Sequence, residues 1–322
     1  MPNVRGVGAG DARVAGVGGQ DAEVTLRVLR AMVTRTETLA VEFGGVRGSS
    51  FVGVIDQGSE GRKGAEQLRY VAAVDVVCGA CDLCRRGLRQ HCQNRATLGQ
   101  RGRDGAFAPT VRVPRMNLVP VPAAVSDEEA LMAQAAALAL HACQVVRIEG
   151  KTYVTVLGDS AEAILTAQAM ARKNASVRLI GQRAERAVLC ERRGIKHRLL
   201  AEIGRRMDQD IVVDCTGDLS GAPVALELVR PRGTIVVRSD APAVPSAVMA
   251  AQGVRLDLAR AAANEVQLIG VRGGSLAEAM GHLERGELDV SGLLQGKFRL
   301  AELGHALEAV REAGSLPVSV VM

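Results

Sequence analysis

At 322 residues the chain is long enough for two domains, and its 48% apolar and 23% charged residues are ordinary values for a globular protein. Four Phe, two Tyr and no Trp predict an aliphatic core and essentially exclude the aromatic platforms that stack single-stranded nucleic acid. The net charge of +5, with neither a leader pattern nor an 18-residue apolar run, predicts a soluble, cytoplasmic protein without a membrane anchor.

The first part of the chain predicts β-structure. Residues 1–20 are glycine-rich and predict weak strands at most. Segments 23–33 (EVTLRVLRAMV) and 51–55 (FVGVI) have the β-branched, partly alternating character of strands. Segment 104–114 (DGAFAPTVRVP) predicts a further pair of strands.

The second part of the chain predicts alternating strands and helices. A capping box of Ser126 with Glu129 opens an alanine-rich helix over 126–146. Apolar runs then alternate with helices, an order typical of βαβ units, so we predict an α/β fold with a Rossmann-type parallel sheet. A last helix, 301–313, precedes an apolar tail (LPVSVVM) that is expected to return to the first domain as a strand. The runs are 152–158, 176–181, 210–217, 233–239 and 265–272, and the helices between them are 160–173, 183–193 and 220–230.

Four of the seven cysteines are clustered in a C-x2-C-x2-C-x7-C pattern. An odd total with such clustering disfavours a disulfide framework. The short gaps bring sulfurs to one side of a knuckle, which suits thiolates binding zinc at about 2.3 Å. Four sulfur ligands leave no open position, so we predict one structural zinc ion; free or oxidised thiols and an iron–sulfur cluster are the alternatives. The predicted ligands are Cys78, Cys81, Cys84 and Cys92.

A β-rich first half with a four-cysteine lobe, followed by a Rossmann unit, resembles the zinc-containing medium-chain dehydrogenases of the alcohol and threonine dehydrogenase type. The resemblance covers nearly the whole chain. It implies a GroES-like domain over 1–122 with a zinc lobe at 78–92, a nucleotide-binding-type domain over 123–272, and a return to the first domain over 273–322. The segments that carry it are FVGV (51–54), CGACDLCRRGLRQHC (78–92), DGAFAP (104–109), VLGD (156–159), VVDCTG (212–217) and ELVRPRGTIVVRS (227–239).

The same resemblance implies where a catalytic zinc would bind, and there the chain departs from the family. Thr34 stands for the family's Cys, Ser49 for its His, and Gln134 for its Cys or Glu. Ser50 follows where members often carry Glu, and Thr36 matches the proton-relay hydroxyl. Neutral hydroxyls and an amide are poor zinc donors. We therefore expect these five positions to be vestigial and the chain to be a degenerate member with no catalytic residues.

The phosphate-binding loop departs from the family as well. The turn should read G-x-G-x-x-G so that the backbone can approach a pyrophosphate. Here Gly158-Asp159-Ser160-Ala161-Glu162-Ala163 keeps the first glycine only. Ser160 puts a side chain where the phosphate should approach, and the charge of Glu162 competes with a bound anion. Cofactor binding through Gly158, Asp159 and Ser160 is therefore expected to be weak or lost.

The end of the second predicted strand reads Gly181-Gln182-Arg183 and carries no acid to hold the ribose diol of NAD. Any dinucleotide is therefore expected to be NADP. Alternatively, Arg183 belongs to a broad solvated basic face, because residues 172–198 hold nine Lys/Arg against two Asp/Glu. Thr216 completes the expected cofactor positions.

Three functions stay open from the sequence. The first is a non-catalytic structural or regulatory subunit, a homodimer or the partner of a paralogue in a larger assembly, joined through the apolar strand 266–271 (VQLIGV). The second is an NADP-dependent oxidoreductase that works without catalytic zinc. The third is a binding module for an acidic partner or nucleic acid. The remaining cysteines, Cys143, Cys190 and Cys215, are expected in the core.

Overall fold

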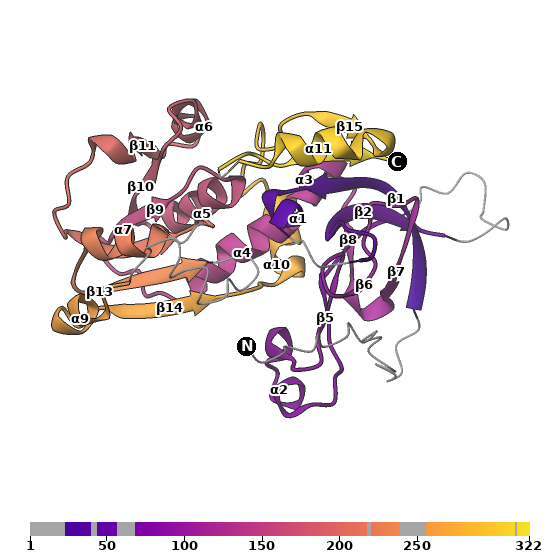
Figure 1. Ribbon diagram of the computed structural model, residues 1–322, viewed down its shortest axis with the longest axis horizontal. Coiled ribbons are helices and arrows are strands. Elements are labelled where there is room, and N and C mark those ends of the chain that lie inside the picture. Colours follow the sequence, from indigo (N-terminus) through magenta and orange to yellow (C-terminus); the bar gives the residue numbers. More distant parts are fainter. Residues whose placement is uncertain (1–22, 40–43, 57–67, 218–219, 239–255, 313) are drawn as a thin grey trace, which may run out of the picture.

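The computed structural model describes residues 23–39, 44–56, 68–217, 220–238, 256–312 and 314–322. Two large β-sheets lie at opposite ends of the long axis, and helices α4 (Ala133–Gln144) and α10 (Leu276–Glu284) lie between them (Figure 1). The weak strands predicted over residues 1–20 fall outside the described residues. Of the helices in the described ranges, none is long and apolar enough to cross a membrane.

The first sheet has seven strands in the order β15-β16-β1-β2-β3-β8, and β7 pairs with the first half of β1. Strand β1 confirms the predicted 23–33, and β16 confirms that the apolar tail returns to this sheet, where it pairs with β1. Leu26, Phe51 and Val320 fill the core. The strands are β1 (Glu23–Val33), β2 (Ser50–Ile55), β3 (Arg69–Ala72), β7 (Thr110–Pro114), β8 (Leu118–Val121), β15 (Lys297–Arg299) and β16 (Val318–Val321).

The strand pair predicted over 104–114 is wrong in its first half, because only β7 is a strand there. The backbone of 105–107 instead bonds to a neighbouring loop, with Gly105 N donating to Val46 O at 2.6 Å and Phe107 N to Arg47 O at 2.8 Å. A Cβ at Gly105 would lie 2.2 Å from the carbonyl oxygen of Gly48, so this approach requires glycine. The apolar residues of 105–107 therefore pack as part of a loop and not as a strand.

A small lobe projects from the first sheet at the lower edge of Figure 1. It contains a three-stranded sheet, a short helix α2 (Asp82–Arg85) and a 3-10 turn η2 (Arg89–His91). The strands are β4 (Asp75–Val76), β5 (Ala96–Leu98) and β6 (Gly102–Arg103). We call residues 78–92, which contain the four clustered cysteines, the cysteine lobe.

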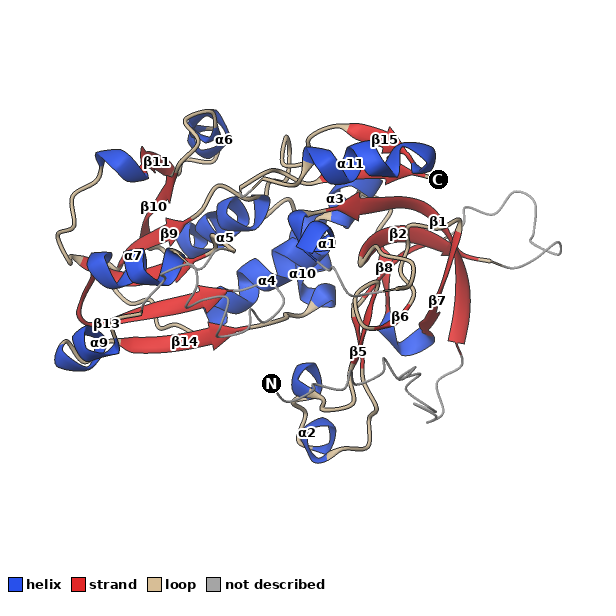
Figure 2. Ribbon diagram, viewed as in Figure 1, coloured by secondary structure: helices blue, strands red, loops and turns tan. Residues whose placement is uncertain are grey.

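The second sheet has six parallel strands in the order β11-β10-β9-β12-β13-β14. This is the strand order of a doubly wound nucleotide-binding fold, so the predicted α/β class is confirmed. Helices cover the sheet (Figure 2). The strands are β9 (Tyr153–Leu157), β10 (Ser176–Gly181), β11 (Lys196–Leu199), β12 (Gln209–Asp214), β13 (Val229–Arg238) and β14 (Gln267–Val271), and the helices α5 (Ala161–Arg172), α6 (Arg186–Glu191), α7 (Gly221–Leu228) and α9 (Leu258–Ala263).

The single helix predicted over 126–146 is two helices, α3 (Asp127–Leu131) and α4. The capping box is confirmed, because Glu129 N donates to Ser126 Oγ at 3.2 Å and Ser126 N donates to the Glu129 carboxylate at 2.7 Å. At the junction Met132 N bonds back only three residues, to Glu129 O. This tight turn ends α3 before α4 begins. The remaining helices are α1 (Arg35–Leu39) and α11 (Leu303–Ala309).

Candidate functional site

The four sulfurs of the cysteine lobe converge, and their Sγ atoms all lie within 4.8 Å of one another. Cys92 Sγ lies 3.5 Å from Cys78 Sγ and 3.9 Å from Cys81 Sγ. Thiolates around a tetrahedral zinc ion with bonds of about 2.3 Å lie roughly 3.8 Å apart. The residues therefore fit a zinc ion, and four sulfur ligands leave it no open position for chemistry.

Backbone amides of the cysteine lobe donate hydrogen bonds to sulfur atoms, which favours the thiolate form that binds a cation. Cys78 N donates to Cys92 Sγ, and Cys81 N donates to Cys78 Sγ, each at 3.4 Å. Hydrogen bonds from the backbone of Ala80 and Cys81 lower the pKa of Cys78 to about 6, whereas burial raises the pKa of Cys84 to about 12. A bound cation would favour the thiolate form of all four cysteines.

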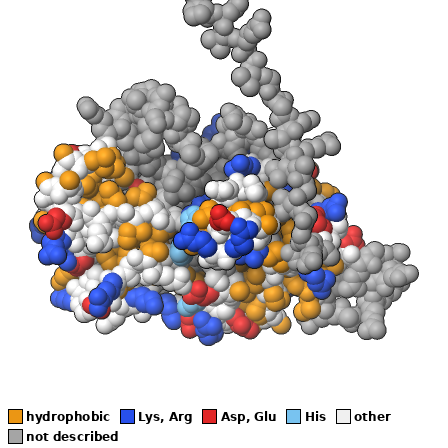
Figure 3. All heavy atoms as spheres, turned by 90° about the horizontal axis from the view of Figure 1, so that it is seen from below, with side chains coloured by type: hydrophobic (Ala, Val, Ile, Leu, Met, Phe, Trp, Pro, Cys, Tyr) orange, Lys and Arg blue, Asp and Glu red, His pale blue; other side chains and the backbone are white. Residues whose placement is uncertain are grey.

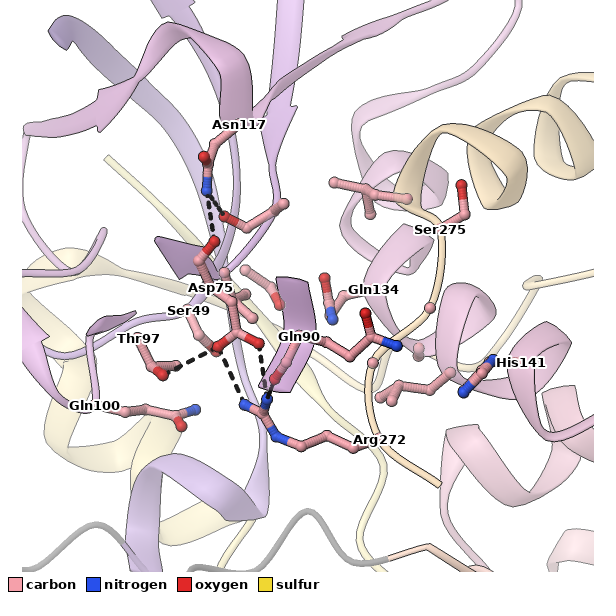
Figure 4. Close-up of a pocket in the computed structure, with 18 of the residues that line it drawn as sticks. Ser49, Asp75, Gln90, Thr97, Gln100, Asn117, Gln134, His141, Arg272 and Ser275 are labelled. Atoms are coloured by element: carbon pink, nitrogen blue, oxygen red, sulfur yellow. Dashed lines mark hydrogen bonds and ion pairs between the residues drawn. The ribbon is translucent and has the colours of Figure 1, made fainter. Parts of the chain in front are cut away.

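A cavity of about 530 Å³ lies between the two sheets, bounded by the cysteine lobe, α4 and the loop after β14 (Figure 4). The five positions that the resemblance assigned to catalysis all line it, so the structure does bring them together. They are Thr34, Thr36, Ser49, Ser50 and Gln134. Other polar side chains of the lining include Gln90, Gln100, Asn117, His141 and Arg272.

A buried carboxylate that the sequence did not single out organises this corner of the cavity. Glu37 is 1% exposed, and its carboxylate accepts from Thr34 Oγ1 at 2.5 Å, from Thr34 N at 2.8 Å and from Ser49 Oγ at 2.9 Å. Buried polar groups are stable when their hydrogen bonds are satisfied, and this carboxylate is satisfied by two hydroxyls and an amide. In the sequence, Glu37 was marked only by its position close to Thr34 and Thr36.

The residues of this corner do not fit a catalytic zinc ion. Catalytic zinc is held by three ligands chosen from His, Cys, Asp and Glu. Thr34 and Ser49 offer neutral hydroxyls whose protons are directed at Glu37, and Gln134 offers a neutral amide. The Glu37 oxygens are in turn occupied by the three donors just described.

A second, smaller crevice of about 250 Å³ lies at the carboxyl ends of β9, β10 and β12. In sheets of this order, that is where a dinucleotide binds. All the predicted cofactor positions except Ser160 line it. They are Gly158, Asp159, Gly181, Gln182, Arg183 and Thr216.

The side chain of Asp159 fills part of this crevice. It is 7% exposed, and its carboxylate accepts from Gln182 N at 2.7 Å and from Arg183 N at 3.3 Å. A Cβ at Gly181 would lie 1.9 Å from Asp159 Oδ1, so the carboxylate packs against the end of β10, the place at which dinucleotide-binding proteins hold the ribose. The Asp159 carboxylate therefore occupies part of the space that an adenosine ribose would take.

The other polar residues of the cofactor loop and its surroundings form hydrogen bonds or ion pairs within the protein. Ser160 caps α5, accepting from Ala163 N at 3.2 Å. Arg183 donates to Glu312 at 2.8 Å and pairs with Glu185 at 3.6 Å. The buried Arg186, which the sequence did not mark, donates to the carbonyls of Asp159 and Gly314, each at 3.0 Å, and burial lowers its pKa.

The broad solvated basic face expected over 172–198 is present in part: Arg172, Lys173, Arg192, Lys196 and Arg198 are exposed, whereas other basic side chains of the segment are paired or buried. The exposed Arg172 also pairs with Glu287 at 3.1 Å, and the Arg193 side chain is 2% exposed and pairs with Asp289 at 3.1 Å. Figure 3 shows Lys and Arg interspersed with Asp and Glu on the face seen from below. The three remaining cysteines are buried as expected.

Residues 12–123 match the Alcohol dehydrogenase GroES-like domain. The chain is 27% identical over 290 residues to an L-threonine 3-dehydrogenase from Chelativorans sp. (strain BNC1), covering 84% of this chain and 80% of that protein. It is 23% identical over 257 residues to a sorbitol dehydrogenase from Halalkalibacterium halodurans, covering 75% and 72%. Over most of its length the chain is therefore similar to dehydrogenases of the medium-chain dehydrogenase/reductase family, and residues 12–123 carry the GroES-like domain of that family.

Solved structures agree on the fold of this family. An alcohol dehydrogenase from Thermus sp. ATN1 superimposes with a TM-score of 0.78 at 21% identity, covering 94% of this chain and 95% of that one. An Escherichia coli alcohol dehydrogenase in complex with NADH superimposes with a TM-score of 0.80 at 20% identity, covering 93% and 92%. At these identities the likeness concerns the arrangement of the two sheets.

Proposed function

We propose that this medium-chain dehydrogenase/reductase homologue keeps a structural zinc ion but does not carry out zinc-assisted hydride transfer, and acts as a non-catalytic structural or regulatory subunit. One observation carries the proposal: Thr34 and Ser49, at the positions of two zinc ligands, donate their hydroxyl protons to buried Glu37. The corner is a closed hydrogen-bond network that needs no cation to be stable.

The chemistry that would be lost is specific. A catalytic zinc ion polarises the substrate oxygen and lowers its pKa toward neutrality. Hydroxyl and amide groups supply neither effect. Thr36 lines the cavity as a relay hydroxyl should, but in this proposal it has no activated oxygen to serve.

The state of the cofactor crevice supports the same proposal. Asp159 brings a carboxylate to the end of β10 and takes up the amides of Gln182 and Arg183. A dinucleotide would have to displace this carboxylate, and its phosphates would meet the negative charge of Glu162 near the start of α5.

Two measurements on the purified protein test the proposal. Elemental analysis is expected to give one zinc per chain, and calorimetric titration is expected to show no submicromolar binding of NADH or NADPH. Two zinc ions per chain would refute the loss of the second metal site. One zinc ion with tight NADPH binding would favour instead an NADP-dependent oxidoreductase without catalytic zinc, a candidate supported by the crevice that remains at the strand ends.

We also propose that the chain is a dimer joined at β14, as a homodimer or with a paralogue. β14 is the last strand of the six-stranded sheet, and Leu268 on it is 40% exposed. An exposed apolar edge strand invites pairing with another chain. Pairing two such edges about a two-fold axis would continue the sheet across both subunits.

A further inference from the structure

Arg272, in the loop after β14, reaches across the cavity and grips the base of the cysteine lobe (Figure 4). Its Nη1 and Nη2 donate to the two carboxylate oxygens of Asp75 at 2.9 and 3.1 Å. Nη1 also donates to Gln90 O at 2.8 Å. A guanidinium bound by both oxygens of a carboxylate is a strong and directional contact.

The two acceptors lie at the two ends of the lobe. Asp75 precedes the first zinc ligand, Cys78, by three residues, and Gln90 precedes the last ligand, Cys92, by two. Arg272 therefore holds both ends of the segment that the metal also holds. One guanidinium can meet both acceptors only while the two ends of the lobe stay together.

A second arginine, Arg95, which directly precedes β5, binds the same pair of acceptors. Arg95 Nη1 donates to Gln90 O at 2.9 Å, and Arg95 Nε lies 3.3 Å from Asp75. Thr97 and Asn117 fix Asp75 further, through its carboxylate at 3.1 Å and its carbonyl at 2.9 Å. The base of the lobe is thus a single network, in which a shift of Gln90 would disturb both arginines.

The network also shapes the cavity. Gln90 and Arg89 from the lobe line it, and so does the loop from Arg272 to Leu276 that leads into α10. Whatever moves Gln90 moves one wall directly and breaks one of the three hydrogen bonds of Arg272, the residue that holds the opposite wall.

We propose that metal binding in the cysteine lobe controls the closure of the interdomain cavity through Arg272. With zinc bound, the lobe holds Gln90 O and Asp75 in place, and Arg272 closes the loop of 272–276 against them. When zinc is lost, Gln90 shifts, Arg272 releases and the cavity opens. Whether the cavity is open or closed then depends on whether zinc is bound in the lobe, independently of any reaction in the cavity.

Hydrogen exchange of the full chain, with zinc loaded and after removal by a chelator, tests the device. In the wild type, zinc removal is expected to speed exchange in 272–276 at least about fivefold, the low end of usual site-to-site couplings. In Arg272→Gln, exchange there is expected to be fast already and to respond little to zinc. Equal wild-type exchange with and without zinc would overturn the proposal.

Zinc release from the loaded protein gives an independent measurement, because a lobe whose two ends are no longer held by Arg272 opens more readily to a chelator. With a colorimetric chelator, Arg272→Gln and Asp75→Asn are each expected to release zinc about fivefold faster than wild type, and the double variant no faster than either single variant. The control Arg147→Gln removes one exposed ion pair, with Glu149, and should match wild type. Wild-type release from Arg272→Gln would overturn the proposal. Slow amide exchange in β9 shows that the second sheet stays folded after zinc removal. If zinc removal also makes exchange in β9 fast, the exchange data no longer isolate the loop, and the zinc release rates alone test the proposal.

Discussion

The carboxylate of Glu37 accepts a hydrogen bond from the hydroxyl of Ser49 at 2.9 Å, across two segments twelve residues apart. The same carboxylate accepts from Thr34, so the two hydroxyls that replace zinc ligands share one buried acceptor. Removing either hydroxyl leaves the buried carboxylate short of a donor, and removing the carboxylate leaves two half-buried hydroxyls without their acceptor.

Substituting Glu37 by Ala is therefore expected to lower the free energy of unfolding by about 1–3 kcal/mol, because it removes the hydrogen bonds from Thr34 and Ser49 and leaves their half-buried donors without this acceptor. Urea denaturation of the zinc-loaded protein measures it. Glu191→Ala, on the surface of α6, serves as the control and should stay within about 0.5 kcal/mol of wild type. Equal losses in the two variants would show that Glu37 is not held as described.

Replacing the three neutral side chains with zinc ligands is expected to create a second metal site. The triple variant Thr34→Cys, Ser49→His and Gln134→Glu places thiolate, imidazole and carboxylate around one corner of the cavity. Elemental analysis should give two zinc ions per chain, against one for wild type. The control Cys84→Ser should fall below one, since the lobe loses a ligand and with it much of its folding energy. A triple variant that holds one zinc ion would mean that the corner is too distorted to close around a metal.

Removing the Asp159 carboxylate is expected to open the crevice at the strand ends. Asp159→Ala frees the amides of Gln182 and Arg183 and removes a negative charge from the place where ribose and phosphate would lie. Dinucleotide affinity should rise about tenfold, or roughly 1.4 kcal/mol, by calorimetry. Glu191→Ala again serves as the control, and an affinity unchanged in both variants would count against Asp159 as the obstruction.

Disrupting the exposed edge of β14 is expected to separate the dimer. Leu268→Lys places like charges on both sides of a two-fold junction, and its side chain is exposed enough for the monomer to fold. Light scattering at micromolar concentration should show a dimer for wild type and a monomer for the variant. Leu68→Lys, at a position that is more exposed and lies beside the first sheet, should stay dimeric. A monomeric wild type would rule out a homodimer and leave only a partner of different sequence. Ile269→Pro, which removes a backbone donor within β14, is the harsher variant.

Acid should weaken the contact between α5 and the end of α10. A hydrogen bond from Arg285, with the charge of Arg172, lowers the pKa of Glu287 from 4.5 to about 2. A lowered carboxyl pKa contributes stability that is fully present above 4.5 and is lost as the pH falls toward 2. The melting temperature of Glu287→Gln should therefore lie below wild type at pH 6, and the difference should vanish near pH 2. Glu265→Gln, in an exposed pair with Arg232, should show little difference at either pH.

Short sequence patterns correctly predicted those strands and helix starts that depend only on neighbouring residues. The runs behind β9, β10, β12, β13 and β14 are apolar strands bounded by turns, and Ser126 with Glu129 marked the start of α3. The strand β11 was missed because KHRL is polar, whereas α10 was missed although Ser275 caps it and its buried residues follow helical spacing. Segment 104–109 was misjudged because its apolar residues pack as a loop.

The cysteine ligands were equally local, since their spacing alone brings four sulfurs together. The partners of Asp159 were not, because Gln182 lies 23 residues away and becomes a neighbour only when the parallel sheet forms. Arg272 and Asp75 are 197 residues apart, and no pattern along the chain links them. Contacts that depend on how two sheets meet leave no periodic trace in the sequence.

The position of β16 has a consequence for the order of synthesis. Residues 318–321 fill the slot between β15 and β1, and Val318 and Val320 are buried in the first sheet's core. The second sheet, by contrast, uses only residues 153–271. A ribosome would therefore have made every strand of the second sheet while the first sheet still lacked a central strand. Until residues 318–321 are made, the second half of β1, Arg30–Val33, lacks the strand with which it pairs in the folded protein, and such an exposed strand edge is prone to association with other chains.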